Sequence, residues 1–389
     1  MSRIYLDHNA SSPLRPVARE AMLRVLQSPA GNPSSPHAFG RAARMAIEDA
    51  REQVARLLGA LTEEIVLTGG GTESNNLAIY GVARAGGAAG RRIVTSLFEH
   101  PSVLGPMDDL ERDGFEVVRL PPTRAGLMQA EEVLRAAPEG TALVSLMLAN
   151  NEVGTVQPIA AIGRELRRRG ILFHCDAAQG VGKLPIDVGE LQVDLLSIAG
   201  HKFGAPQGAG ALFVRQGLAI RPHLRGGGQE LNRRPGTESV AAFAGLGAAA
   251  AEALAEGAAG ARRLATLRDR LECAVLERGL GSRVNGQSAA RVPNTSSLAF
   301  EGATGEALVM ALDLEGIAVS AGSACSAGTV RRSHVLEAMG LREESACSIR
   351  VSLGPATTEA EIDAFVGALE RVVGRVRSAA ERVISGGRV

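Results

Sequence analysis

Residues 194–204 read DLLSIAGHKFG, a short apolar run that ends in a glycine, a histidine and the lysine Lys202. Four further apolar runs are each followed by polar or ionisable residues. They lie at 64–68, 92–97, 142–149 and 171–175. These runs alternate with longer amphipathic segments, a pattern that is typical of repeated β-α units around a mainly parallel sheet. The sequence therefore predicts an α/β fold.

The residues that follow the five runs are of types that carry chemistry. They are Thr72 and Glu73, His100, Asn151, Asp176 and Gln179, and His201 and Lys202. Ligands of open parallel sheets bind outside the carboxyl ends of the strands. We therefore expect these side chains to converge on one crevice, although roughly 130 residues of sequence separate the first from the last.

The segment TGGGTES, residues 68–74, joins a predicted strand to a predicted helix. Its backbone N–H groups and the Thr72 hydroxyl at a helix N-terminus favour a phosphate. It has neither the GxxxxGK[ST] nor the GxGxxG spacing, and taken alone it could be a turn that only packs a helix on a sheet. With an imidazole, an aspartate and a lysine at neighbouring strand ends, the segment suits pyridoxal 5′-phosphate (PLP), which binds a lysine amine and a carboxylate.

Each candidate also has a simpler interpretation. Lys202 could be a surface lysine, Asp176 a helix N-cap, and His100 a core or capping histidine. The small residues of GHKFGAPQG would let the backbone approach a cofactor closely, which favours the cofactor interpretation of Lys202. The ring of His100 could stack on a pyridine ring and transfer protons.

Composition restricts the class of protein. The 389 residues carry a formal net charge of +0, which does not indicate a surface for nucleic acid. The cysteines form no CxxC pair, so we expect no metal site. The start, MSRIYLDHNASSPL, has no apolar run behind basic residues, and no stretch approaches the length of an uninterrupted membrane span. We expect a cytoplasmic protein with reduced thiols and no membrane contact.

A second domain is predicted after a long Ala-rich helical region that begins near residue 238. Strand candidates follow at 296–300, 316–320 and 348–353, and helix candidates at 304–314, 330–339 and 358–385. We predict a large domain over 1–255, with the segment 1–15 packing on a smaller α+β domain over 256–389.

Cys325 lies in SAGSACSAG, where no bulky side chain would bury the sulfur, so its thiol should be reachable. An incidental cysteine in a small-residue turn is the alternative. Cys175 in a strand, Cys273 in a helix and Cys347 beside a strand are better explained by inert packing.

Eleven segments in order carry a resemblance to a known family. They are IYLDHNASSP, GNPSSPHAFGR, GGTESNN, EHPSV, NNEVG, HCDAAQ, GHKFGAP, GGGQE, RRPGTES, SAGSACSAG and SIRVSLG. Over nearly its whole length the chain resembles the cysteine desulfurases of the NifS/IscS type, within the class V aminotransferase family. The resemblance implies a homodimeric fold-type I PLP enzyme with a seven-stranded sheet. Such an enzyme converts L-cysteine to L-alanine and transfers the sulfur to an enzyme cysteine as a persulfide, a sulfurtransferase reaction.

The resemblance also implies roles for individual residues. Lys202 would form the Schiff base, Asp176 would pair with the pyridinium nitrogen, and Gln179 would pair with the ring hydroxyl oxygen. His100 would stack on the ring and assist proton transfer. The phosphate would be held by Gly71, Thr72 and His201, and by Thr237 of the other subunit. Asn151 would contact the cofactor and the substrate, and Arg350 would bind the substrate's carboxylate. Cys325 would carry the persulfide and would meet an iron–sulfur cluster or another sulfur acceptor.

The sequence departs from the family pattern in three places: Ala199 where many relatives have a phosphate-binding serine, Gln207 where a lysine is common, and Arg331 and Arg332 after the Cys325 segment. Two alternatives remain open. One is another PLP enzyme of the same fold, an aminotransferase or a selenocysteine lyase, which would not need Cys325. The other is a non-catalytic sulfur-assembly scaffold, which the presence of Lys202 and Asp176 disfavours.

Overall fold

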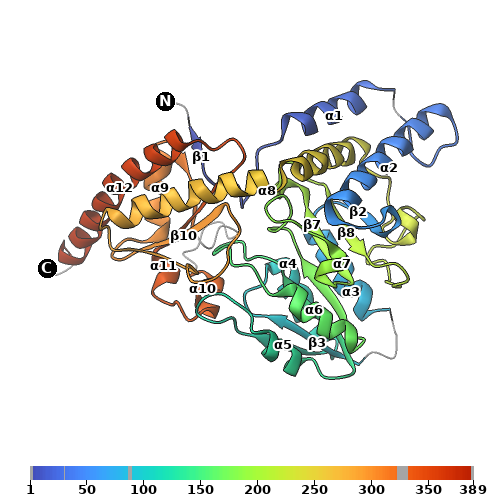
Figure 1. The fold of residues 1–389 in the computed structure, drawn as a ribbon, viewed down its shortest axis with the longest axis horizontal. Helices are drawn as coiled ribbons and strands as arrows, with labels where there is room; N and C mark the ends of the chain where they lie inside the picture. Colours follow the sequence, from blue (N-terminus) through green and yellow to red (C-terminus); the bar gives the residue numbers. More distant parts are fainter. Residues whose placement is uncertain (1–2, 30, 86–89, 322–331, 387–389) are drawn as a thin grey trace.

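The computed structural model describes residues 3–29, 31–85, 90–321 and 332–386, and it consists of two units joined by one long helix (Figure 1). The larger unit is built on a seven-stranded sheet. Its order is β2 (Ile65–Thr68), β8 (Gly210–Val214), β7 (Leu195–Ala199), β6 (Leu172–Asp176), β5 (Thr141–Met147), β3 (Arg92–Ser96) and β4 (Glu116–Leu120). Only β8 runs antiparallel to its neighbours. The predicted α/β fold with a mainly parallel seven-stranded sheet is confirmed.

The central strands are apolar on both faces because helices cover both faces of the sheet. On one face, Val66 packs with α3 (Gly71–Ala83) and α4 (Pro101–Arg112). On the other, Ile65 and Leu67 pack with α2 (Ala38–Leu58) and α6 (Ile159–Arg168). Neighbouring residues of one strand therefore belong to different core clusters, and a continuous apolar run is what a strand buried on both faces requires.

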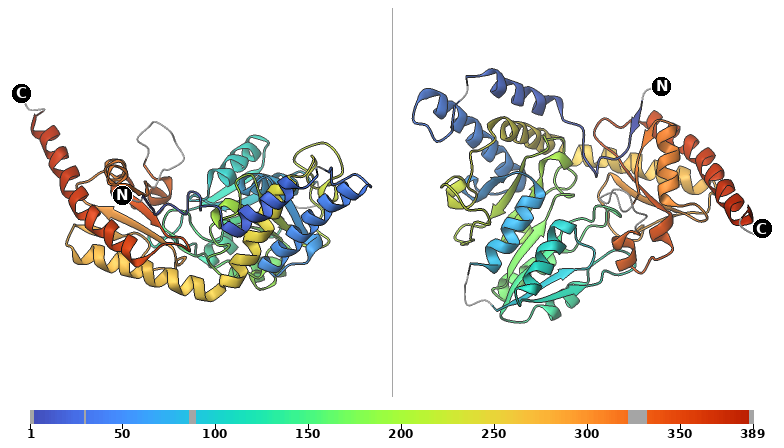
Figure 2. Two further views of the ribbon diagram at one scale, coloured as in Figure 1. Left: turned by 90° about the horizontal axis from the view of Figure 1, so that it is seen from above. Right: turned by 180° about the vertical axis from the view of Figure 1, so that it is seen from behind.

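The helix α8 (Val240–Glu277) connects the two units. Its first part packs on α2 and on α1 (Pro16–Gln27), and its later part packs on α12 (Glu359–Gly386). It bends at Gly257, where φ is 43° and ψ is −138°, and Figure 2 shows the bend between the units. By length and composition alone this helix could cross a membrane, and its packing as a core helix accounts for the same apolarity.

The smaller unit has an antiparallel sheet in the order β12 (Ser320–Ala321), β13 (Ser348–Ser352), β10 (Thr295–Phe300) and β9 (Ser282–Val284). Its core includes side chains of α8, of α9 (Gly305–Leu314) and of α12. The N-terminal strand β1 (Ile4–Tyr5) pairs in parallel with β11 (Ile317–Ala318), so the beginning of the chain packs on this unit. The shorter helices are α5 (Ala130–Ala136), α7 (Val188–Leu191), α10 (His334–Ala338) and α11 (Glu344–Cys347). The domain boundary at 255 stays a prediction.

Several details of the prediction are wrong. The strand expected at 316–320 is two strands of two residues each, and the helix expected at 330–339 begins only at His334 within the described residues. The edge strand β4 was not expected, because its five residues are only partly buried. Cys273 does not pack inside the protein but lies exposed on α8, whereas Cys175 is buried in β6 as expected.

Candidate active site

Nine of the predicted site residues line one cavity of about 400 Å³ at the carboxyl edge of the seven-stranded sheet. They are Gly71, Thr72, His100, Asn151, Asp176, Gln179, His201, Lys202 and Arg350. The strands deliver eight of them to the cavity from the segments that follow β2, β3, β5, β6 and β7. The convergence expected from the sheet topology is therefore observed.

Lys202 ends a single 3₁₀ turn, Gly200–Lys202, that follows β7 directly. The turn is tightly packed, because a Cβ on Gly200 would lie only 2.8 Å from the Ala209 carbonyl oxygen. The Lys202 Nζ donates hydrogen bonds to the backbone carbonyls of Asn9, at 2.7 Å, and Ala10, at 2.9 Å. The lysine is held at the cavity wall, so the surface-lysine interpretation is wrong.

Asp176 is the last residue of β6, and its side chain faces the cavity while being almost fully buried. Its Oδ2 accepts a hydrogen bond from Asn75 Nδ2 at 2.7 Å, and its Oδ1 accepts one from the Ala178 backbone N–H at 2.9 Å. No helix begins after Asp176, so it is not a helix N-cap. A carboxylate fixed in this way fits the pyridine nitrogen of PLP.

His100 is both a capping residue and a cavity residue. Its Nδ1 accepts a hydrogen bond from the Ser102 backbone N–H at 3.1 Å at the start of α4 and lies 2.7 Å from Ser102 Oγ. Burial lowers the pKa of His100; Asp176 opposes this shift, and Lys202 adds to it. The ring is therefore neutral near pH 7, as a group that accepts a proton must be.

The phosphate end of the site is a hollow of about 250 Å³ next to the cavity. It is lined by Gly69, Gly70, Gly71, Thr72, Glu73, His201, Gln207, Gly208 and Ala209. Gly71 opens α3, and a Cβ there would lie 3.0 Å from the Ala199 Cβ, so the glycine keeps the helix N-terminus close to β7. Backbone N–H groups at a helix N-terminus bind phosphate. The lysine, the carboxylate and this hollow together fit PLP.

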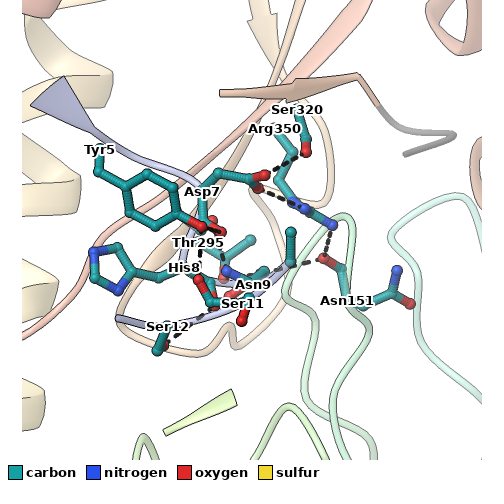
Figure 3. Close-up of polar contacts among 12 residues, drawn as sticks. Tyr5, Asp7, His8, Asn9, Ser11, Ser12, Asn151, Thr295, Ser320 and Arg350 are labelled. Carbon is teal, nitrogen blue, oxygen red and sulfur yellow. Dashed lines mark hydrogen bonds and ion pairs between the residues drawn. The ribbon is translucent and has the colours of Figure 1, made fainter. Parts of the chain in front are cut away.

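Arg350 lines the cavity from the smaller unit, and Figure 3 shows its contacts with Asp7 and Asn151. It lies on β13, an inner strand of the smaller sheet, and it is 3% exposed, so a solvated edge arginine is excluded. Its Nη2 pairs with Asp7 Oδ1 at 2.8 Å, and its Nη1 donates to the Asn151 carbonyl at 3.1 Å. The other Asp7 oxygen accepts a hydrogen bond from Ser320 Oγ at 2.9 Å. The guanidinium is thus anchored by the N-terminal segment and still faces the cavity.

Two buried glutamates contact the segment that begins at residue 333, Glu152 through its carboxyl group and Glu99 through its backbone carbonyl. Glu152 accepts a hydrogen bond from Ser333 Oγ, while the carbonyl of Glu99 contacts His334 Nε2 at 3.0 Å. Burial raises the pKa of Glu152 to about 7, against the smaller opposing effects of Ser333 and Arg350. Burial raises the pKa of Glu99 to about 8, with hydrogen bonds from Ser96 and Met147 opposing the shift and Asp176 adding to it.

Sequence reasoning missed the residues that support the site. Asn75 and Ser102 hold Asp176 and His100. From the N-terminal segment, Asp7 pairs with Arg350 and Asn9 lines the cavity. The motif IYLDHNASSP contains the last two, but nothing in it specifies their distant partners. Thr237 is exposed and does not line the cavity of its own chain. Cys325 lies outside the described residues.

The comparisons with known proteins agree with this geometry. The model of the aminotransferase class-V family matches residues 4–365. A protein named cysteine desulfurase IscS, from Dictyoglomus turgidum, is 45% identical over 376 residues, which cover 96% of this chain and 95% of that protein.

Two solved structures are similar. One, titled NifS-like protein, has a TM-score of 0.90 and 36% identity and covers 96% of this chain and 100% of its own. The other, titled SspA in complex with cysteine, has a TM-score of 0.79 and 36% identity, with coverage of 91% and 100%. The chain belongs to the class-V aminotransferase family, and the resemblance seen in the sequence is confirmed. Members of this family are PLP-dependent.

Proposed function

We propose that this chain is a cysteine desulfurase that converts L-cysteine to L-alanine and transfers the sulfur to Cys325 as a persulfide. The observation that carries the proposal is the meeting of an amine, a carboxylate and a guanidinium, from Lys202, Asp176 and Arg350, around one cavity. Relatives over nearly the full length are named cysteine desulfurases, which supports this activity over an aminotransferase or a selenocysteine lyase.

The cavity residues would hold PLP by its two ends. Lys202 would supply the amine that binds the aldehyde, Asp176 would pair with the pyridine nitrogen, and Gln179 would face the ring hydroxyl oxygen. His100 would stack on the ring, and Thr72 and His201 would bind the phosphate with the N-terminus of α3. When bound, PLP withdraws electrons from the carbon next to the attached amino group, which makes that carbon's proton acidic.

Arg350 binds the carboxylate of L-cysteine. Within the described residues its guanidinium makes two hydrogen bonds, and its buried Nε has no partner, so donors remain for a substrate carboxylate. The Lys202 amine would be the group that takes the proton from the α-carbon. His100, neutral because burial lowers its pKa, exchanges the proton of the thiol.

The sulfur transfer balances without an oxidant or a reductant. The Cys325 thiolate attacks the substrate sulfur, a sulfur–sulfur bond forms, and the carbon–sulfur bond of the substrate breaks. Its electron pair stays on the substrate carbon, which takes up a proton to give L-alanine. L-Cysteine and one enzyme thiol thus become L-alanine and one enzyme persulfide.

A homodimer would complete the phosphate site, with Thr237 reaching the cofactor of the second subunit. Two features of its neighbourhood support a contact surface. Glu230, Leu231 and Asn232 all have positive φ, between 48° and 64°, which is strained backbone for residues other than glycine. Large apolar side chains nearby in the sequence and on α1 and α2 are exposed: Leu26, Phe39, Met45, Leu224 and Leu231. We further propose a cytoplasmic enzyme whose persulfide supplies iron–sulfur assembly or another acceptor.

The proposal is tested by comparing the purified wild type with Cys325→Ser. L-Alanine and sulfide are assayed from L-cysteine with a reductant, and cofactor content is read from visible absorbance. Cys273→Ser is the matched control, because Cys273 is an exposed cysteine on α8. We expect all three proteins to bind PLP and only Cys325→Ser to lose turnover. Equal turnover by Cys325→Ser would favour a lyase or an aminotransferase instead.

A further inference from the structure

The lysines of this chain are unusually placed. Of its 42 Lys and Arg residues only two are lysines, Lys183 and Lys202, and the other 40 are arginines. Lysine differs from arginine in its compact point charge and in the ease with which its pKa shifts on burial. Lys202 has an evident reason to be a lysine, because the cofactor needs a primary amine. Lys183 has no role in the function proposed above, yet it lies beside the same site.

Lys183 is buried behind the cavity rather than in its wall. It is 7% exposed, and its Nζ donates hydrogen bonds to Gln179 Oε1 at 2.5 Å and to Asn9 Oδ1 at 3.0 Å. The turn that carries it is packed closely, since a Cβ on Gly180 would lie 2.4 Å from Leu148 Cδ2. Lys183 lines a second hollow of about 490 Å³ and not the cofactor cavity, which Gln179 lines. Its hydrogen bonds connect it to the cavity through Gln179 and Asn9.

Asn9 joins the two lysines. Its backbone carbonyl accepts hydrogen bonds from Lys202 Nζ at 2.7 Å and from Gln179 Nε2 at 3.0 Å, while its side-chain oxygen accepts from Lys183. Asn9 itself is fixed by bonds to Thr295 Oγ1 and to the Asn151 carbonyl (Figure 3). The two Asn9 oxygens that accept these hydrogen bonds are therefore fixed in position, and the donor groups must be oriented toward them.

The amide of Gln179 can face the cavity in either of two orientations, and its partners decide between them. As an ammonium group Lys183 has donors only, so the atom that it touches must be the amide oxygen. The amide nitrogen then bonds the Asn9 carbonyl and keeps its second N–H. Without Lys183, rotation of the amide would present an acceptor where a donor stood.

We propose that Lys183 is a positioning residue that holds the Gln179 amide with its N–H, and not its oxygen, toward the ring hydroxyl oxygen of PLP. This inference rests on the proposed function in one respect, that Gln179 faces the cofactor.

Burial, Lys202 and Arg350 lower the pKa of Lys183, and Lys183 in turn contributes to the lowered pKa values of His8 and His201. Its ammonium group or amine can donate to Gln179 in either protonation state.

The experiment is a pH titration of the visible absorbance of the holoenzyme in the absence of substrate. Wild type, Lys183→Met, Gln179→Leu and the double variant are compared, because Met keeps the length of the side chain and removes the nitrogen.

Donation to the ring oxygen favours loss of the proton from the lysine-bound cofactor. We therefore expect Lys183→Met to move the absorbance midpoint to higher pH by about half a unit or more. The Gln179→Leu background should nearly abolish this shift. Lys183→Arg keeps a donor, so its absorbance midpoint should lie closer to that of wild type than the midpoint of Lys183→Met does.

Two results would overturn the proposal. An unchanged midpoint in folded, PLP-loaded Lys183→Met would mean that the Asn9 carbonyl orients the Gln179 amide without help from Lys183. A shift of equal size in both backgrounds would mean that the charge of Lys183 acts directly and not through Gln179. If Lys183→Met does not fold, Lys183→Leu, which also lacks a donor, enters the same cycle. A wild type that binds PLP without turning over L-cysteine would contradict the proposed function and leave this comparison intact.

Discussion

The two ends of the cavity are built in different ways. At the Lys202 end, Asp176 ends one strand of the large sheet, and His100 and Lys202 follow two others. Asn75 and Ser102 hold Asp176 and His100, and the carbonyls of Asn9 and Ala10 hold Lys202. At the Arg350 end, the contacts of one guanidinium join segments that lie 343 and 199 residues apart in the chain. The first end depends on the order of strands in one sheet. The second exists only when the N-terminal segment and both units are packed together.

This difference predicts that the two ends of the cavity affect different kinetic parameters. Side chains held rigidly by one sheet are suited to the bond-breaking and bond-forming steps, because these steps require fixed geometry around the reacting atoms. A guanidinium shared between segments suits binding, because its contacts can change when a carboxylate arrives. Substitutions at the Lys202 end should therefore lower kcat, and substitutions at the Arg350 end should raise KM.

The largest effect is expected for Lys202→Ala. Removing the amine takes away both the covalent link to PLP and the base for the α-proton, so kcat should fall by more than about 10³-fold. The assay is L-alanine release from L-cysteine, with cofactor content measured on the same samples. Residual activity within tenfold of wild type would mean that the chemistry does not depend on this end.

A second prediction concerns the buried carboxyl group of Glu152 at the Arg350 end. Its folded-state pKa, about 7, lies above the value of 4.5 for an unperturbed glutamate. The folded protein therefore keeps a proton that the unfolded chain releases. The stabilisation is complete below pH 4.5 and is lost as the pH rises to about 7.

Glu152→Gln should abolish this loss. Relative to wild type, we expect its free energy of unfolding to gain about 2 kcal/mol as the pH is raised from about 5 to 7.5, measured by urea unfolding. Glu301→Gln is the control, because the Glu301 side chain is 79% exposed. A constant difference between wild type and Glu152→Gln across this interval would show that Glu152 is ionised in the folded protein.

The smallest effect is expected for Asp7→Ala. Losing the partner of Arg350 should loosen the guanidinium and raise KM for L-cysteine by about tenfold, with kcat changed little. Tyr5→Phe is the control, because the Tyr5 hydroxyl bonds the carbonyls of Asp7 and Ser11 without touching Arg350. In an Arg350→Ala background, Asp7→Ala should add almost nothing. A fall in kcat with unchanged KM would break the division between the two ends.

The Lys202 end could be predicted from the sequence, and the reason is physical. Asp176 and Lys202 each lie at or just beyond the end of a buried apolar run. Parallel strands bring such positions to one edge of a sheet. The helix α3 begins at Gly71, inside the TGGGTES turn that was expected to hold the phosphate. At the Lys202 end, the local sequence pattern and the strand order of the sheet therefore predict the same positions for these residues.

The Arg350 end could be predicted only through the resemblance to a family. Asp7 follows a strand of two residues, too short for a periodic signal, and its partner is on a different sheet. Lys183 lies seven residues beyond the end of β6 rather than directly after it, and the turn around Gly180 that buries it is tightly packed. Contacts between distant segments leave no spacing in the sequence from which they could be derived.

The central claim is that PLP binds to Lys202, and the scarcity of lysines makes it directly testable. The holoenzyme is reduced with borohydride and cleaved at Asp187 or Asp194, which lie between the two lysines of the chain. The mass of each fragment then shows which lysine carries the cofactor. We predict the label on Lys202 and none on Lys183. A label on Lys183, or no label in a protein saturated with PLP, would contradict the assignment of the site.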